Sequence, residues 1–390
     1  MTFGDDDGPG MLGDYVRGFP GEDGRWYLVD RPPTEVKVYD ESGDFLHRFG
    51  RGGEGPGEFS LIRSVLPLED GIVAVLDDPS GLKFFDAAGN LLREARLPFP
   101  PTSNGVVYAD GLGMVIAANA PTPERTGLPL HVVDLDDGSV DLSFGSLTGE
   151  YRLSDVGGAS RVLAEAAPGT VWAARLYEYR VELWTPDGLE RSLVRDVPWF
   201  PATTLSTLAH GWAERPNTIL SGVATSGSQM WVKLRVADEH WESASDENPA
   251  TPDLDRFFDT IIEVIDLDES RVIGRVRLDE DYSNFVGPGM IGRTAVTPAG
   301  SVRYEVYRIS TTTPGSGQVT TVPGFIIDRY SLIQIGIPDT AEERDHVPDT
   351  VHSARDSVAA VDCGPARTRE TDHVVCRHSA CSPGHRGASF

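Results

Sequence analysis

A unit of about 47 residues is repeated near the beginning of the chain, where Phe3 to Asp30 is echoed by Phe49 to Asp77. The shared steps are Gly8-Pro9-Gly10 with Gly55-Pro56-Gly57, and Asp23-Gly24 with Asp70-Gly71. Repeats of this length, built from short apolar alternations and glycine turns, are typical of small sheets that cannot bury their faces alone. Such units are stable only when they pack against neighbours of the same kind.

A turn glycine followed by an alternating strand occurs six times along the chain. These glycines are Gly24, Gly71, Gly111, Gly169, Gly227 and Gly300. Most units continue with a third strand and a more polar outer strand, as in Val36 to Tyr39 and Phe45 to Phe49. We therefore predict an all-β fold, a six-bladed β-propeller with four-stranded antiparallel blades around a central channel.

The predicted propeller domain covers residues 1–336. Its predicted blades are residues 11–49, 60–97, 103–144, 158–195, 218–278 and 285–335. Because the N-terminal segment is short, we expect Phe325 to Ile333 to supply the outer strand of the last blade. Two stretches interrupt the regular pattern: Pro198 to Pro216, with a short helix expected around Leu205 to Trp212, and the acidic insertion Asp238 to Asp255. Long loops in compact folds are often functional.

Residues 337–390 lose the apolar alternation, so we predict a disordered tail that is either genuine or the product of a frameshift. This tail holds the candidate soft-metal residues Cys363, His373, Cys376, His378, Cys381 and His385. Their spacing fits no familiar zinc module. We therefore predict no metal site in the tail.

The net charge of the chain is −26, and lysine occurs only at Lys37, Lys83 and Lys233. So strong a negative field repels phosphate backbones, and we find no local basic patch, so we exclude nucleic acid as a partner.

No apolar run is long enough for a membrane-spanning helix. We expect a monomer.

The repeat residues resemble the NHL-type six-bladed β-propellers. In that pattern a turn glycine, an apolar strand ending in Val-x-Asp, a strand ending in an aromatic residue and Asp, and a Phe-Gly step follow one another. Here they are Asp23-Gly24, Val29-Asp30, Tyr39-Asp40 and Phe49-Gly50. The segments Met230 to Asp238, Ile261 to Asp266 and Gly287 to Gly289 resemble uncharacterised bacterial six-bladed, TolB-like propellers.

Members of that group are commonly exported, so the resemblance implies an extracytoplasmic, periplasmic or secreted location. The sequence shows no signal peptide. Met1 directly precedes a Phe-Gly step that elsewhere lies between blades, so we expect that an upstream segment is missing.

Sequence motifs for catalysis are absent. Gly50 to Gly55 matches the glycine pattern of dinucleotide sites, but it leads into a strand and we interpret it as a turn between blades. Calcium-dependent lactonases of the gluconolactonase type share the six-bladed form and hold their metal with Glu, Asn and Asp in the channel. Only Asn104 and Asn284 lie near the beginning of an innermost strand, and we interpret both as turn residues.

Four arginines form the strongest candidate site. Arg63 and Arg161 stand eight residues before their turn glycines, and Arg17 and Arg293 stand seven before theirs. This spacing predicts an arginine near the beginning of four innermost strands, where guanidinium groups could hold a small anionic ligand. The alternative is that these arginines pair with acidic residues of adjacent blades, and one residue of slip would turn a side chain to the other face.

We predict a non-enzymatic propeller that binds a small anionic ligand or an unknown protein at the channel mouth, without a catalytic residue, metal or other cofactor. The alternative is a metal-dependent lactonase-like hydrolase with Ca²⁺ in the channel. Convergence of the four arginines in one opening would favour a small anion. An apolar or aromatic loop face would favour a protein partner.

Overall fold

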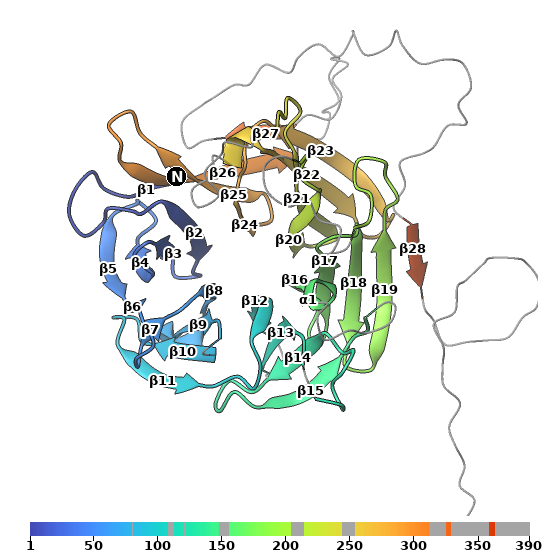
Figure 1. The fold of residues 1–390 in the computed structure, drawn as a ribbon, viewed down its shortest axis with the longest axis horizontal. Coiled ribbons are helices and arrows are strands. Elements are labelled where there is room, and N and C mark those ends of the chain that lie inside the picture. The colour runs from blue at the N-terminus through green and yellow to red at the C-terminus, as the bar shows by residue number, and fades with distance from the viewer. Residues whose placement is uncertain are drawn as a thin grey trace, which may run out of the picture.

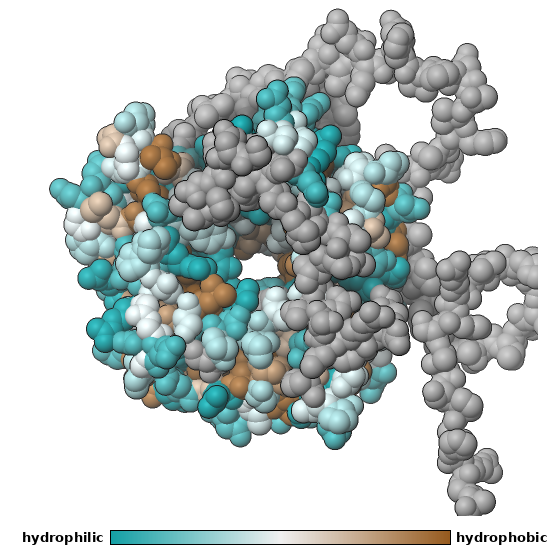
Figure 2. Space-filling view, viewed as in Figure 1, coloured by the Kyte–Doolittle hydropathy of each residue, from teal (hydrophilic) through white to brown (hydrophobic). Residues whose placement is uncertain are grey.

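The computed structural model describes residues 1–79, 81–107, 113–120, 122–147, 156–203, 214–243, 254–311, 325–328 and 359–362. In these residues, short antiparallel sheets stand around a common axis like the blades of a wheel (Figure 1). The predicted fold, with six four-stranded antiparallel blades, is therefore confirmed. The space-filling view shows an opening at the axis of the ring (Figure 2).

The blades follow the chain in order. Blade 1 contains β2 (Tyr15–Pro20), β3 (Trp26–Arg31), β4 (Glu35–Tyr39) and β5 (Phe45–Phe49), and blade 2 contains β8 (Ile62–Pro67), β9 (Val73–Asp77), β10 (Gly81–Phe85) and β11 (Leu91–Ala95). Blade 3 contains β12 (Pro101–Val107), β13 (Met114–Ala118), β14 (Leu130–Val133) and β15 (Val140–Phe144), and blade 4 contains β16 (Arg161–Glu165), β17 (Val171–Arg175), β18 (Arg180–Thr185) and β19 (Gly188–Val194). Blade 5 contains β20 (Ile219–Ser226), β21 (Gln229–Ala237), β22 (Phe258–Asp266) and β23 (Arg271–Leu278), and blade 6 contains β24 (Asn284–Gly287), β25 (Met290–Val296), β26 (Val302–Thr311) and β1 (Thr2–Phe3).

Smaller elements connect or extend the blades. They are the parallel pair β6 (Arg51–Gly52) and β7 (Glu58–Phe59), the helix α1 (Val156–Ala159), the 3-10 turns η1 (Glu69–Gly71) and η3 (Leu254–Arg256), and the strands β27 (Phe325–Asp328) and β28 (Ala359–Asp362). The first strand of each blade, β2, β8, β12, β16, β20 and β24, lies nearest the axis (Figure 1).

The N-terminal strand completes the ring. β1 pairs with β26 through Thr2 and Glu305 and through Phe3 and Tyr304. The segment expected to take this outer position, Phe325 to Ile333, contributes β27, which pairs with the other end of β26. Because β26 has ten residues and β1 only two, one strand has room for both partners.

Hydrophobic clusters lie between neighbouring blades. In the described residues, each of the six junctions has its own cluster of buried side chains. At the junction of blades 6 and 1, the ring of Phe3 lies 5.1 Å from that of Trp26 and 5.6 Å from that of Tyr39. This arrangement explains the repeat, because each blade buries its faces only against the next one.

Two repeated residue pairs fasten the loops of the first two blades. Lys37 Nζ lies 2.6 Å from Asp30 Oδ2, and Lys83 Nζ lies 2.8 Å from Asp77 Oδ2. The second oxygen of Asp30 accepts a hydrogen bond from the backbone N–H of Gly13. The recurring Asp of the sequence repeat is therefore a buried, hydrogen-bonded and ion-paired side chain.

The sixth blade departs from the predicted strand order. The strand after Gly300 is β26, the third strand of its blade, whereas the strands after the other predicted glycines are second strands. The equivalent turn glycine is Gly289, which has φ +67°. The prediction was wrong here because the fourth strand of this blade is β1, from the N-terminus. Only three strands of the blade, β24, β25 and β26, therefore follow one another in the sequence before Thr311.

Several predictions fall on residues that the structure does not describe. The expected helix at Leu205 to Trp212 lies outside the described residues. The same holds for the Cys and His residues of the predicted tail. Within residues 337–390, the structure describes only β28, which pairs antiparallel with β19.

Candidate functional site

The predicted arginines Arg17 and Arg63 are neighbours on adjacent innermost strands. Arg17 in β2 donates hydrogen bonds to the carbonyl oxygens of Ile62 and Arg63 in β8. Arg63 donates to Asp78 Oδ2 from Nε at 3.1 Å and from Nη2 at 2.5 Å. Burial and, to a smaller extent, the positive charges of Arg31 and Arg63 lower the pKa of Arg17. The hydrogen bonds of Arg17 therefore join blade 1 to blade 2, and Arg63 forms an ion pair with Asp78.

The other two predicted arginines lie in different blades. Arg161 in β16 is 2% exposed and donates to the carbonyl oxygens of Gly158 and Ser160, and burial lowers its pKa to about 10. Arg293 is not on an innermost strand as predicted. It lies in β25, the second strand of blade 6. The strand that precedes Gly300 is the second of this blade and not the first, because Gly300 precedes the third strand, β26.

Acidic partners surround Arg293. It forms ion pairs with Glu280 and with Glu305, whose Oε2 lies 3.4 Å from the arginine Nε. The structure thus brings Arg17 and Arg63 together, and it places Arg161 and Arg293 elsewhere in the ring, each with acceptors of its own.

The two asparagines lie on innermost strands but connect blades rather than form turns. Asn104 Nδ2 donates to the carbonyl oxygen of Leu163 at 3.0 Å, and Leu163 N donates back to Asn104 Oδ1 at 3.1 Å. Asn284 Nδ2 donates to the carbonyl oxygen of Gly18 at 3.0 Å. These amides cross-link blade 3 to blade 4 and blade 6 to blade 1.

The described residues do not provide a metal centre. No group of three His, Cys, Asp or Glu side chains among them could hold a metal ion. In the same part of the chain, no helix is long and apolar enough to cross a membrane.

A pocket of about 350 Å³ lies at the junction of blades 4 and 5. It is lined by Trp199, Pro201, Arg215, Pro216, Asn217, Thr218, Val236, Ala237, Ile261, Arg275 and Arg277. These residues belong to the connection between the two blades and to the ends of strands β21, β22 and β23. Both irregular stretches of the sequence border the pocket, since the first contributes Trp199, Pro201, Arg215 and Pro216 and the second begins directly after Ala237.

The charge of the lining is opposite to that of the molecule. Three arginines, Arg215, Arg275 and Arg277, line the pocket, and none of the lining residues is Asp or Glu. The whole chain has a net charge of −26. The three guanidinium groups supply the lining with charged hydrogen-bond donors that suit an anion.

The floor of the pocket is formed by alternate residues of two paired strands. Asp259, Ile261 and Glu263 share one face of β22, because side chains two apart point to the same side. On β23, Arg277 is opposite Ile261 and Arg275 is opposite Glu263. Asp259 and Glu263 therefore flank Ile261 on β22, and Arg277 and Arg275 lie beside this row as neighbours on β23.

One of these acids is fully buried and fixes the surrounding aromatic side chains. Glu263 is 0% exposed, forms an ion pair with Arg195 and accepts a hydrogen bond from the Tyr179 hydroxyl. Burial, reinforced by the negative charge of Glu263, raises the pKa of Tyr179 well above its usual value. Tyr179 therefore remains a neutral hydrogen-bond donor.

The indole of Trp199 is held between cations and rings. The guanidinium of Arg275 lies 4.4 Å from the Trp199 ring centroid, and that of Arg195 lies 5.9 Å away. The rings of Tyr179 and Phe200 are each 6.3 Å from it. Such contacts orient the Arg275 side chain on one wall of the pocket.

The second acid holds Arg277. Asp259 accepts hydrogen bonds from Arg277 Nε at 2.6 Å, and Arg277 Nη2 donates to the carbonyl oxygen of Ala237 at 2.9 Å. The pKa of Asp259 lies above its usual value, because the effect of burial is larger than the opposite effect of pairing with Arg277. Arg277 is thus anchored two residues along β23 from Arg275, on the same face of the strand.

Sequence reasoning missed the pocket because its residues are far apart in the chain. Two signals were available: the alternating Arg275 and Arg277 in an outer strand, and the Trp199-Phe200 pair in an irregular connection. Neither indicates the other, since Trp199 meets Arg275 only when blades 4 and 5 pack together.

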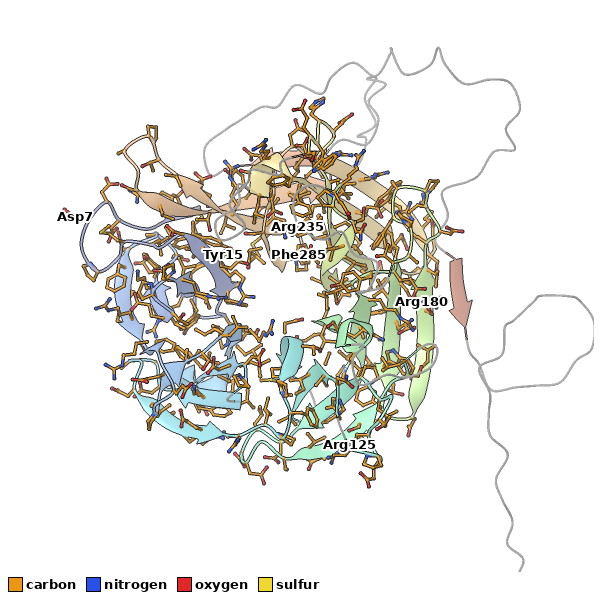
Figure 3. All side chains as sticks on the ribbon, in the orientation of Figure 1. Asp7, Tyr15, Arg125, Arg180, Arg235 and Phe285 are labelled. Carbon is orange, nitrogen blue, oxygen red and sulfur yellow. The ribbon has the colours of Figure 1, made fainter. Side chains whose placement is uncertain are left out.

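In Figure 3, the labelled Phe285 and Arg235 lie toward the inner edge of the ring, and Arg180 and Arg125 lie farther from the axis.

Comparison with known proteins agrees with the fold. Residues 21–111 match the DUF5128 family, described as 6-bladed beta-propeller. No functionally curated protein matches the sequence.

Solved structures share the architecture at low sequence identity. The structure resembles a member of the duf4221 family from Bacteroides vulgatus, with a TM-score of 0.56, 12% identity and coverage of 84% of this chain and 96% of that one. It also resembles an exported-protein candidate from Bacteroides fragilis, with a TM-score of 0.52, 12% identity and coverage of 79% and 94%. The protein is therefore a six-bladed β-propeller similar to uncharacterised bacterial proteins.

Proposed function

We propose that the protein is a non-catalytic binding protein for a small organic anion, which it holds in the pocket at the junction of blades 4 and 5. The observation that carries the proposal is the lining, with three arginines and no acidic residue in a protein of net charge −26. Guanidinium groups bind carboxylates through paired, charge-assisted hydrogen bonds. The proposal keeps the anionic ligand of the sequence prediction and moves its site from the channel mouth to this pocket.

The shape and chemistry of the pocket support this function. A volume of about 350 Å³ is at the lower end of the range for ligand pockets, which suits a small molecule rather than a protein segment. Pro201, Pro216, Val236 and Ala237 provide apolar walls, and Asn217 and Thr218 add neutral polar groups. Arg215 is exposed and has no ion-pair partner among the described residues, so its charge is available to a ligand.

Calorimetric titration with carboxylates and with uncharged alcohols of equal length tests the proposal. The native protein should bind the carboxylates and not the alcohols. Replacing Arg215 and Arg275 together by Gln should weaken carboxylate binding at least about tenfold, because two charge-assisted hydrogen bonds are lost.

Arg271→Gln is the matched control, because Arg271 lies on the same strand and pairs with the exposed Glu269 outside the pocket. This variant should bind carboxylates as the native protein does. If the native protein binds no carboxylate, or binds alcohols equally well, the proposal is wrong.

We also propose that the protein acts outside the cytoplasm as a monomer. Support comes from the architecture that it shares with the exported-protein candidate from Bacteroides fragilis. Fractionation of cells that express the natural gene, followed by detection of the protein in the cytoplasmic and extracytoplasmic fractions, would test the location. Light scattering of the purified protein would test the monomer.

A further inference from the structure

We infer that the ligand carries two anionic groups joined by an apolar spacer, so that the pocket selects dicarboxylates over monocarboxylates. This inference rests on the proposed function and specifies its ligand class. It comes from the arrangement of Arg275, Ile261 and Arg277 on the pocket floor.

Each of the two arginines is held by a buried acid on one side and retains donors on the other. Arg277 uses Nε and Nη2 for Asp259 and for the carbonyl oxygen of Ala237, which leaves Nη1 without a partner among the described residues. Arg275 points its Nε toward Glu263, with 3.7 Å between Nε and Oε1, and its two terminal nitrogens have no partner in the described part of the chain. Both guanidinium groups can therefore donate to a further anion.

Apolar surface lies beside the two cationic positions. Ile261 lies between Asp259 and Glu263 on β22, directly opposite Arg277, and it lines the pocket together with Val236 and Ala237. A hydrocarbon spacer can bury its surface here, whereas a second polar group in the middle of the ligand would lose its hydration without a partner. A ligand that reaches both arginines therefore gains from an anionic group at each end and from an apolar centre that packs on Ile261, Val236 or Ala237.

The strand geometry sets the length of the spacer. The Cα atoms of Arg275 and Arg277, two residues apart on one face of β23, are separated by ~6.8 Å. With C–C bonds of about 1.5 Å, an extended chain of four methylene groups places its two carboxylate carbons about 6 Å apart. Adipate is therefore a suitable probe, hexanoate is its counterpart with one charge, and malonate is a dicarboxylate that is too short to reach both arginines.

Calorimetric titration of the full chain with these three compounds at constant ionic strength tests the inference. Adipate should bind about tenfold more tightly than hexanoate or malonate, because the second carboxylate adds a charge-assisted hydrogen bond. Arg275→Gln should reduce adipate binding to the level of hexanoate. Arg277→Gln should do the same, and Arg271→Gln should leave the preference for adipate unchanged.

Arg275→Gln is the safer variant, because Glu263 keeps its ion pair with Arg195. Arg277→Gln removes the ion-pair partner of Asp259, so its result counts only if circular dichroism shows a native thermal transition. Equal affinity for adipate and hexanoate in the native protein would overturn the inference and leave anion binding intact. Binding of none of the three compounds would overturn the proposed function as well.

Discussion

Replacing Lys233 by Met tests the electrostatics of blade 5. Lys233 is 1% exposed, and its Nζ donates one hydrogen bond, at 3.0 Å to Ser221 Oγ. Burial lowers its pKa from the ordinary 10.5 to about 7. Between these two values the unfolded chain binds a proton that the folded chain has released, so the stability contributed by this group rises as the pH rises from about 7 to about 10.

The magnitude follows from the same two values. A pKa difference of one corresponds to ~1.4 kcal/mol, so between about pH 6 and about pH 9.5 the native protein should gain about 3 kcal/mol relative to Lys233→Met. At pH 6 the variant should be the more stable protein, because methionine fills the same volume without a buried charge. Other titrating groups are common to both proteins, and their contributions cancel in the difference.

Urea unfolding at a series of pH values measures this difference. Lys83→Met is the matched control, because Lys83 is buried to a similar extent but forms an ion pair with Asp77. That variant should be less stable by roughly 3–5 kcal/mol, because it removes the ammonium group that forms an ion pair with the buried Asp77 carboxylate. If Lys233→Met is less stable than the native protein at pH 6, or if the difference between them is constant with pH, the reasoning about Lys233 is wrong.

Three further substitutions test how the ring is held together, each by denaturant unfolding. Asn104→Ala removes both hydrogen bonds to Leu163 and should cost about 1–3 kcal/mol, and an unchanged midpoint would show that these bonds do not join blades 3 and 4. Gly222→Ala would place a Cβ 2.6 Å from Phe285 Cβ and should cost roughly 1–3 kcal/mol through overpacking of blades 5 and 6, so a neutral result would contradict this contact. Phe3→Ala should cost roughly 3–5 kcal/mol, because Phe3 is 1% exposed in the last junction of the ring, and a small loss would mean that β1 does not close it.

Local patterns were sufficient to predict the blades. The alternation in Trp26 to Val29 and the turn at Gly24 depend on neighbours within a few residues, and both appear in the structure as predicted. The sixth blade was misread because its fourth strand, β1, is some three hundred residues away from β26 in the sequence. A strand supplied by the other end of the chain leaves no signal in the local pattern.

The four predicted arginines show what spacing in the sequence leaves open. Spacing from a turn glycine places a residue along a strand, but it does not determine which acceptors surround the side chain. Arg17 reaches backbone carbonyls of the next blade, and Arg63 reaches Asp78. Because these partners come from packing between strands, the spacing could not distinguish a ligand site from an ion pair or a hydrogen bond to the backbone.

The amino-acid sequence by itself determined the number of blades, the strand alternation and the net negative charge of the chain, because each depends on residue order or composition alone. The tertiary structure decided where positive charge gathers. Trp199, Arg215 and Arg275 come from segments that the sequence separates, and they line one pocket because blades 4 and 5 pack side by side. Burial of apolar strand faces drives that packing, and the position of the pocket follows from it.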